Sequence, residues 1–520
     1  MFLAVFLIAL SLPLATAQEY PYDGEGYIAE SCTSIMVTKR ASTDGSVITS
    51  HTCDGGYRTW ATIEKGATHP KGEMHEVLRG TMHTAFPGDT AGVKKMGEIP
   101  EARRTYSYLN TAYPSFNEKQ LGIGETTFTG PDTLINPKGW FTIEELERVA
   151  LQRCSTAREA IRLMGSLAEK YGYGDGGECL TVADKKEVWQ FEILGCGKDR
   201  IGAVWAAKRV PEGHVAVSAN IPRIGRLERE NKDGFMASDN VEAVAKEYGL
   251  WDGEGEFIFW KAFNSSYAAG KNFREREFFI LSTLAPSLGL TMDMEELPFS
   301  VVPDKKVSVE DVMALLRSTY EGTDMDMTKG ILYDYPKTKT REAYTDVSPI
   351  ANPWMTTTTL ATLNKIAPGT VTFRRTVSVA WCAYSHVIQL RDFLPDDVGG
   401  VCYLALDNPG QSPRIPVFCG TEKLPEAYDF CGQKLYREDC ALWTFRRSNR
   451  LATVSWQRTK DTFMKTVLDC QGQMLEGVRK MNPTAPRYDL TSYTEECYER
   501  AACAWKEMEA KFWNMFGKGF

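Results

Sequence analysis

Residues 32–46 read Cys-Thr-Ser-Ile-Met-Val-Thr-Lys-Arg-Ala-Ser-Thr-Asp-Gly-Ser, and they decide the fold that we expect. Apolar and β-branched residues predict one strand over residues 34–39 and a second over residues 46–52. Asp44-Gly45 between the two runs is a strong hairpin signal. The hairpin would place Cys32 at a sheet edge, beside the end of the second strand.

The chain starts with residues 1–17, which are typical of a secretory signal peptide. Residues 2–14 are almost wholly apolar but too short to span a bilayer, and Ala15-Thr-Ala17 matches the small-residue cleavage pattern. No Lys or Arg precedes the apolar run, so a retained anchor stays open as an alternative. We expect a secreted protein, or one in an oxidising periplasmic or lumenal compartment, without membrane contact after cleavage.

Residues 18–31 are interpreted as a propeptide, because they contain Pro, Gly and acidic residues without apolar periodicity. Signal cleavage would not expose Cys32, so a second cut between Ser31 and Cys32 is needed. Such a cut would give Cys32 a free α-amino group, with a pKa of about 8, as a general base beside the thiol nucleophile. The alternative role for Cys32 is that of a disulfide partner.

The composition is that of a globular protein, since 43% of the 520 residues are hydrophobic and 25% are charged. No low-complexity linker divides residues 32–520, so we expect one large domain with an insertion at about residues 230–330. The net charge of −8, without a basic stripe, argues against nucleic acid or an anionic membrane as partner. The sequence leaves the oligomeric state open, including a homo-oligomer.

The cysteine count of thirteen bears on the same thiol. Setting Cys32 aside leaves an even twelve, which in an exported protein would allow up to six disulfides and leave Cys32 unpaired. The alternative is that the cysteines are free and buried. The pairing cannot be read from the spacing.

Capping boxes predict two helices, which start at Thr142 and Thr156 and carry Glu145 and Glu159 three residues later. The chain from Asp461 onward is also helical in pattern. Strands, then helices, then strands again indicate an α+β layered sandwich rather than alternating βαβ units. The expected hairpins join 179–182 to 188–194 and 203–210 to 214–218, and further strands are expected at 371–390 and 401–406.

A resemblance to a known family begins with Cys32-Thr-Ser-Ile-Met-Val and Lys39-Arg-Ala-Ser-Thr-Asp-Gly-Ser46. These segments resemble the start of the mature C69 dipeptidases, which are N-terminal-nucleophile (Ntn) hydrolases related to secernins and, more distantly, to penicillin V acylases and bile salt hydrolases. The resemblance implies a four-layer αββα fold, hydrolysis of the amide bond of dipeptides, and no metal or organic cofactor. Further matching segments are 205–211, 215–220, 375–379, 398–401, 405–409 and 449–453.

The resemblance implies roles for three residues near the hairpin. Cys32 would attack the scissile carbonyl and form a thioester, while its own α-amine takes and returns the proton. Asp54 matches the Asp that holds the nucleophile and its amine, with an exposed turn residue as the alternative. His51 stands where many relatives have Arg; it could orient the thiol and titrate near neutral pH, or be a plain strand-end residue.

Two asparagines and one arginine complete the site that the resemblance implies. Asn220, before Ile221-Pro222, resembles an oxyanion-hole Asn, and Asn117 resembles a second active-site Asn from an Asn-Glu-Lys-Gly-Leu motif. Position 120 is Gln instead of Gly here, so Asn117 could equally be a turn residue. Arg375 is the candidate for binding the substrate carboxylate, with a solvated surface arginine as the alternative.

Other kinds of site have little support in the sequence. His69, His75 and His83 lack a metal-binding spacing, and Gly122-Ile-Gly124 lacks the third glycine of a dinucleotide site. Two other functions stay open: an N-acyl amide hydrolase with the same nucleophile, and a non-catalytic, secernin-like protein whose Cys32 stays capped. A pocket for a charged amine or carboxylate would favour dipeptides, and an apolar acyl pocket would favour N-acyl amides.

Overall fold

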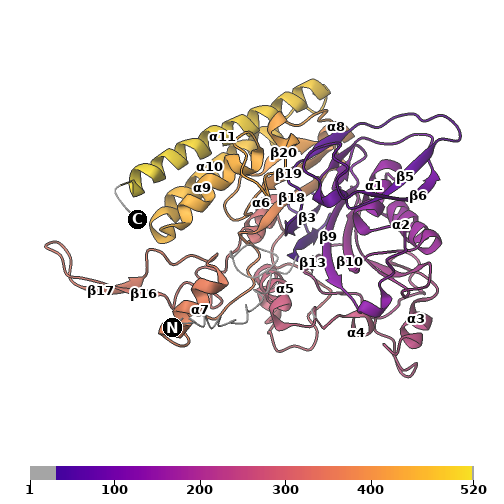
Figure 1. Cartoon of the computed structure of the whole chain (residues 1–520), viewed down its shortest axis with the longest axis horizontal. Helices are drawn as coiled ribbons and strands as arrows, with labels where there is room; N and C mark the ends of the chain where they lie inside the picture. Colours follow the sequence, from indigo (N-terminus) through magenta and orange to yellow (C-terminus); the bar gives the residue numbers. More distant parts are fainter. Residues whose placement is uncertain (1–30, 267, 518–520) are drawn as a thin grey trace, which may run out of the picture.

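The computed structural model describes residues 31–266 and 268–517. Two eight-stranded antiparallel sheets and the helices around them form most of it, which confirms the predicted α+β class (Figure 1). The expected signal peptide and all but the last residue of the expected propeptide lie outside the described residues.

The first sheet contains the predicted hairpin at its centre. The side chain of Asp44 accepts hydrogen bonds from the backbone nitrogen (3.0 Å) and the hydroxyl (2.6 Å) of Ser46, and Gly45 takes the positive φ that this turn requires. Strand order is β15-β13-β2-β3-β18-β19-β20, with β1 paired to β3. The strands are β1 (Ser31–Cys32), β2 (Ser34–Val37), β3 (Val47–Asp54), β13 (Val215–Ser218), β15 (Ser300–Val301), β18 (Cys382–Leu390), β19 (Gly400–Leu406) and β20 (Ile415–Phe418).

The second sheet lies against the first, with β3 in contact with β9 and β10. Its order is β14-β12-β11-β10-β9-β8-β7-β4. The predicted hairpin of β10 and β11 is confirmed. The one predicted around residues 211–213 is wrong, because β12 and β13 belong to different sheets and this turn carries the chain between them. The strands are β4 (Thr62–Glu64), β7 (Tyr108–Asn110), β8 (Phe116–Asn117), β9 (Gly122–Thr129), β10 (Gly177–Ala183), β11 (Val188–Gly195), β12 (Ala203–Arg209) and β14 (Phe235–Ala237).

Helices cover both sheets on the sides that face away from each other. Helices α1 (Ile143–Arg153) and α2 (Ala157–Tyr171) pack together, and α2 lies on β10, β11 and β12. Helix α5 (Lys271–Leu284) contacts β13, and α6 (Val309–Leu316) contacts β3 and β18. The predicted capping box at Thr156 is present, whereas the hydroxyl of Thr142 has no hydrogen-bond partner among the described residues.

The C-terminal part is helical, as predicted. Three helices run side by side along one end of the first sheet, where they contact β19 and β20 (Figure 1). They are α9 (Ala441–Thr453), α10 (Trp456–Lys480) and α11 (Arg487–Phe516). The remaining elements include α3 (Val241–Glu247), α4 (Phe259–Phe263), α7 (Thr357–Ile366), α8 (Asp396–Gly399), and the hairpins β5 (Met74–Arg79) with β6 (Lys94–Pro100) and β16 (Leu332–Tyr335) with β17 (Tyr344–Val347).

The expected disulfides are not found. All thirteen cysteines lie within the described residues, and all are free thiols. Every one except Cys431 and Cys503 is buried. A buried thiol packs as a small apolar side chain. The buried cysteines therefore contribute to the packing of the protein interior without forming covalent bridges.

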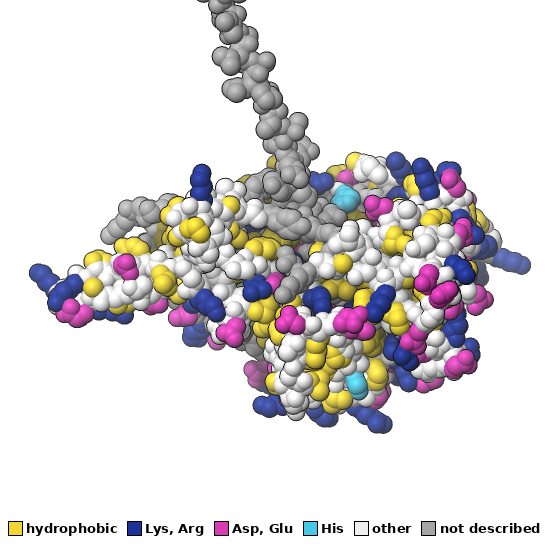
Figure 2. Space-filling model, turned by 90° about the horizontal axis from the view of Figure 1, so that it is seen from below, with side chains coloured by type: hydrophobic (Ala, Val, Ile, Leu, Met, Phe, Trp, Pro, Cys, Tyr) yellow, Lys and Arg dark blue, Asp and Glu magenta, His cyan; other side chains and the backbone are white. Residues whose placement is uncertain are grey.

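The surface has mixed charge. On the face shown in Figure 2, acidic and basic side chains are interspersed rather than gathered by sign. No helix within the described ranges has the length and apolarity needed to cross a bilayer. Mixed charges of this kind give no extended basic surface on that face for a nucleic acid backbone.

Candidate active site

Cys32 lies where β1 meets the end of β3, with Cys53 opposite it in the register and Asp54 opposite Ser31. Its side chain is buried, and its Sγ atom lies 3.3 Å from Oε2 of Glu125 on β9. Its backbone nitrogen, still in the peptide bond to Ser31, donates a hydrogen bond to Oδ1 of Asn220 (2.9 Å). Cys32 is therefore an internal residue of the described chain, with an amide nitrogen and no free amine.

Asn220 follows β13 and holds the backbone of Cys32. It has a φ of 64°, in the left-handed region that Asn tolerates better than most residues. Its Oδ1 atom accepts from Cys32, and its Nδ2 atom donates to the backbone oxygen of Thr127 (2.6 Å). Asn220 thus holds the backbone of Cys32 through Oδ1, and one N–H of its amide group is bound to Thr127.

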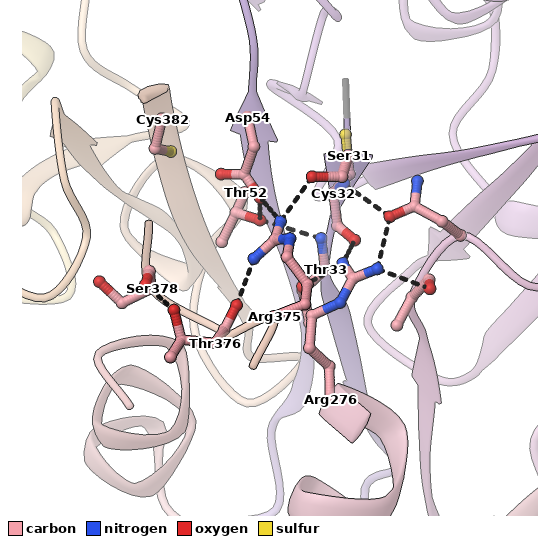
Figure 3. A network of polar contacts seen from close by, with 12 residues as sticks. Ser31, Cys32, Thr33, Thr52, Asp54, Arg276, Arg375, Thr376, Ser378 and Cys382 are labelled. Carbon is pink, nitrogen blue, oxygen red and sulfur yellow. Dashed lines mark hydrogen bonds and ion pairs between the residues drawn. The ribbon is translucent and has the colours of Figure 1, made fainter. Parts of the chain in front are cut away.

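Arg276, which the sequence analysis missed, lies on α5 within the segment expected to be an insertion. Its guanidinium group donates to the backbone oxygens of Cys32 and Ala219, to the hydroxyl of Thr33 (2.9 Å) and to Oδ1 of Asn220 (2.8 Å) (Figure 3). Its side chain is fully buried. One cation thus joins Cys32 and Thr33 to the residues that follow β13.

Asp54 and Arg375 form a buried ion pair on the other side of Cys32. Nη2 of Arg375 lies 2.6 Å from Oδ2 of Asp54 and 2.6 Å from the hydroxyl oxygen of Ser31, and Figure 3 shows this cluster. Thr52 also donates to Oδ2 of Asp54 (3.1 Å). Neither alternative from the sequence applies, because Asp54 is not an exposed turn residue and Arg375 is not a solvated surface residue.

Asn117 stabilises a turn, and its side chain does not share the hydrogen-bond network around Cys32. Its Oδ1 atom accepts from the backbone of Lys119 (3.0 Å) and Leu121 (3.1 Å), and its Nδ2 atom donates to the backbone oxygens of Leu151 and Cys154 at the end of α1. Among the described residues none of these side-chain bonds reaches Cys32 or its partners. The structure thus favours the turn-residue alternative.

His51 and Glu125 lie directly beside the thiol. Nδ1 of His51 is 2.7 Å from the backbone oxygen of Glu125, and Nε2 has no hydrogen-bond partner among the described residues. Burial lowers the pKa of His51 to about 4, so the ring is neutral at neutral pH and the expected titration near pH 7 is wrong. Burial, and then the carboxyl of Glu125, raise the pKa of the Cys32 thiol, and burial raises the pKa of Glu125 to about 7.

Comparison with known proteins assigns this arrangement to a family. The family model described as Peptidase family C69 matches residues 31–469, which is most of the chain and begins at the junction before Cys32. The chain belongs to peptidase family C69. It is therefore a hydrolase of the peptidase class, and the resemblance found in the sequence is confirmed.

Individual relatives of this C69 peptidase carry dipeptidase names. It is 25% identical to a "Probable dipeptidase" of Latilactobacillus sakei over 422 residues, covering 78% of this chain and 77% of that protein. It is 27% identical to a "Probable dipeptidase" of Salmonella dublin, with 75% and 81% covered, and 23% identical to a "Probable dipeptidase B" of Streptococcus pyogenes serotype M1, with 82% and 79% covered.

The acidic side of the C69 site was also missed in the sequence. Glu125 and Glu178 are strand residues that no sequence motif marks, and the pairing of β9 with β10 brings their carboxyl groups together, with that of Glu125 beside the thiol. Cys32, His51 and Glu125 form the one group of three buried ligand side chains in the described part of the chain whose donor atoms all lie within 4.8 Å of one another. A metal ion held by these three side chains would occupy the Cys32 sulfur.

Proposed function

We propose that this C69 peptidase is a secreted, cysteine-type dipeptidase of the Ntn-hydrolase class, which loses a signal peptide (residues 1–17) and then a propeptide (residues 18–31) and uses Cys32 as its nucleophile. The observation that carries the proposal is the position of Cys32. Its nitrogen is held by Asn220, its carbonyl by Arg276, and its thiol lies 3.3 Å from a carboxyl group. Two facing sheets covered by helices support the four-layer αββα fold that goes with this mechanism.

Maturation is proposed to start from the uncleaved form. The nitrogen of Cys32 is then an amide and cannot act as a base, so the thiol proton passes to Glu125, the carboxyl that Sγ contacts. The sulfur attacks the carbonyl carbon of Ser31, the Ser31–Cys32 bond breaks, and the departing nitrogen takes a proton. Water hydrolyses the resulting thioester, which releases the propeptide carboxylate and restores the thiol.

Turnover is proposed to repeat this chemistry with the new α-amine of Cys32 as the base. The amine takes the thiol proton, the sulfur attacks the dipeptide carbonyl, and the leaving amino acid receives the proton. Water then hydrolyses the acyl thioester and frees the first amino acid. Asn220 Oδ1, which accepts from Cys32 nitrogen in the precursor, would hold the α-amine in the same place.

Departure of Ser31 would also change the surroundings of Arg375. Its Nη2 atom would lose the serine hydroxyl and keep Asp54 as its partner. That donor could then serve the carboxylate of a dipeptide, which is the role proposed for it from the sequence.

The test is N-terminal sequencing of the secreted protein together with activity on a dipeptide panel and an N-acyl amide panel. Wild type is expected to begin at Cys32 and to cleave dipeptides, whereas Cys32→Ala should keep its propeptide and cleave neither panel. Cys503→Ala, at the exposed cysteine of α11, is the matched control and should behave as wild type. A wild-type protein that stays uncleaved, or that begins at Cys32 and hydrolyses no dipeptide, contradicts the proposal.

A further inference from the structure

The C69 site contains more buried carboxyl groups than the proposed chemistry uses. Glu125 on β9 and Glu178 on β10 project from the same face of the second sheet, because Glu178 lies opposite Thr127, two residues from Glu125. Both side chains are almost completely buried, and their carboxyl groups lie against each other. Oε2 of Glu125 is the atom that contacts the Cys32 sulfur at 3.3 Å.

Polar atoms around this pair lack partners among the described residues. Oε2 of Glu178 has no hydrogen-bond partner, and its side chain is only 3% exposed. The hydroxyl of Tyr173, which is fully buried and faces the same carboxyls, has none either. Both carboxyl oxygens of Glu144 and of Glu147 on α1 are also buried without a partner, and Glu147 faces Glu125.

A cluster of this kind lacks a positive charge. Burial, and then the neighbouring carboxyls of Glu125 and Asp175, raise the pKa of Glu178 well above its usual range, so its carboxyl stays neutral until a cation comes to lie beside it. Buried carboxylates are costly unless a cation or several donors satisfy them. An ammonium group supplies both a positive charge and three donors, so it is the ligand chemistry that fits best.

The geometry of a dipeptide attacked by Cys32 brings its α-ammonium group close to Glu125 and Glu178. In a dipeptide the α-ammonium nitrogen lies about 2.5 Å from the carbonyl carbon that the thiol attacks, because only Cα separates them. A nitrogen so close to the reacting carbon must lie near Sγ. The carboxyl that touches Sγ is therefore within reach of it.

We propose that Glu125 and Glu178 bind the free α-ammonium group of the residue on the acyl side of the scissile bond, so that the site selects peptides with a free N terminus. This inference rests on the proposed dipeptidase function and names the feature of the substrate that the site recognises. N-acylated peptides would place an uncharged amide against two carboxyl groups and bind poorly. A Lys or Arg side chain on the substrate is the other source of a cation, and the test separates the two.

The first experiment needs no variant. Wild-type protein is assayed with Ala-Ala, with N-acetyl-Ala-Ala, and with propionyl-Ala, in which hydrogen replaces the ammonium group. We expect kcat/KM to be at least about 10- to 100-fold lower for the two compounds without the ammonium, the size of a lost charged hydrogen bond. Lys-Ala tests whether the carboxyl groups bind a side-chain cation instead. Its kcat/KM should exceed that of Ala-Ala by no more than about threefold.

The second experiment uses Glu178→Gln, which has the same shape and lacks the charge. Because Glu178 makes no described hydrogen bond to Cys32, the variant should still cut at Cys32, which intact mass shows. Its preference for Ala-Ala over N-acetyl-Ala-Ala should fall about 10-fold, mainly through a higher KM. The ratio of the two substrates cancels changes in thiol reactivity, so a merely structural role would leave it unchanged. Glu98→Gln, at an exposed position of β6, is the matched control.

The outcomes separate this inference from the proposed function. Cleavage of all three compounds at similar rates, or a Glu178→Gln variant with the wild-type preference, overturns the ammonium site and leaves the peptidase intact. A preference for Lys-Ala that disappears in Glu178→Gln, with N-acetyl-Ala-Ala cleaved as well as Ala-Ala, assigns the carboxyls to the side chain and also overturns it. A correctly processed wild type that cleaves none of them contradicts the dipeptidase proposal itself.

Discussion

The ion pair of Asp54 and Arg375 gives a sharp test of how the region before Cys32 is held. The two side chains are 0% and 7% exposed and lie 2.6 Å apart, so Asp54→Asn leaves a buried guanidinium without its counter-charge. Removing one partner of a buried pair costs about 3–5 kcal/mol. The unfolding entropy of about 490 residues is about 1 kcal/mol per kelvin, so Tm should fall by about 3–5 °C.

The assay is thermal unfolding in the Cys32→Ala background, where the chain stays uncleaved and Ser31 keeps its contact with Arg375. Glu98→Gln, which breaks an exposed pair with Lys95, should leave Tm unchanged. Asp54→Asn with Arg375→Met should recover most of the loss, because both buried charges are then gone. An Asp54→Asn protein that melts with the Glu98→Gln control would refute the reasoning.

The remaining predictions address pH, positioning, structure and thiols. Burial raises the pKa of Glu144 to about 8, above an unfolded value near 4.5, so the precursor should lose stability as pH rises from about 4.5 to 8; Glu144→Gln should melt higher than its parent at pH 8 and equally at pH 4. In Arg276→Lys the ammonium group cannot reproduce the guanidinium fork that binds four oxygens, so kcat/KM should fall about 100-fold while Tm changes by only a few degrees. Near-normal activity of this variant would refute the positioning role of Arg276. Asn117→Ala should lower the free energy of unfolding by about 1–3 kcal/mol while kcat/KM of the folded enzyme stays within about twofold, and a large loss of activity would restore it to the site. Thiol titration of the unfolded, unreduced precursor should give thirteen thiols, and a count lower by an even number would show disulfides.

Local patterns predicted the local structure well. Asp44-Gly45 formed the expected turn, and Thr156 with Glu159 formed the expected capping box. Both depend on groups a few residues apart, so sequence alone contains the relevant contacts. The hairpin at residues 211–213 failed for the opposite reason, because a short turn between two strands looks the same whether they pair or enter separate sheets.

The candidate site was predictable only where the resemblance supplied it. Cys32, Asp54, Asn220, His51 and Arg375 all lie in one region, and Asn117 does not share their hydrogen bonds. The residues that hold them, such as Arg276, were not predictable from the sequence. Arg276 lies in a run of charged helix residues, and such runs are usually solvated, whereas here Glu275, Arg276 and Glu277 are all buried and nothing in the sequence marks them.

By itself the sequence determined the family and the hairpin beside Cys32, because these depend on residue order and short-range geometry. Only the tertiary structure decided that the cysteines are free, that His51 is neutral, and that Glu125 and Glu178 meet beside the thiol. The physical reason is that burial and charge proximity set these properties. Both arise from chain segments far apart in sequence, brought together when the two sheets pack.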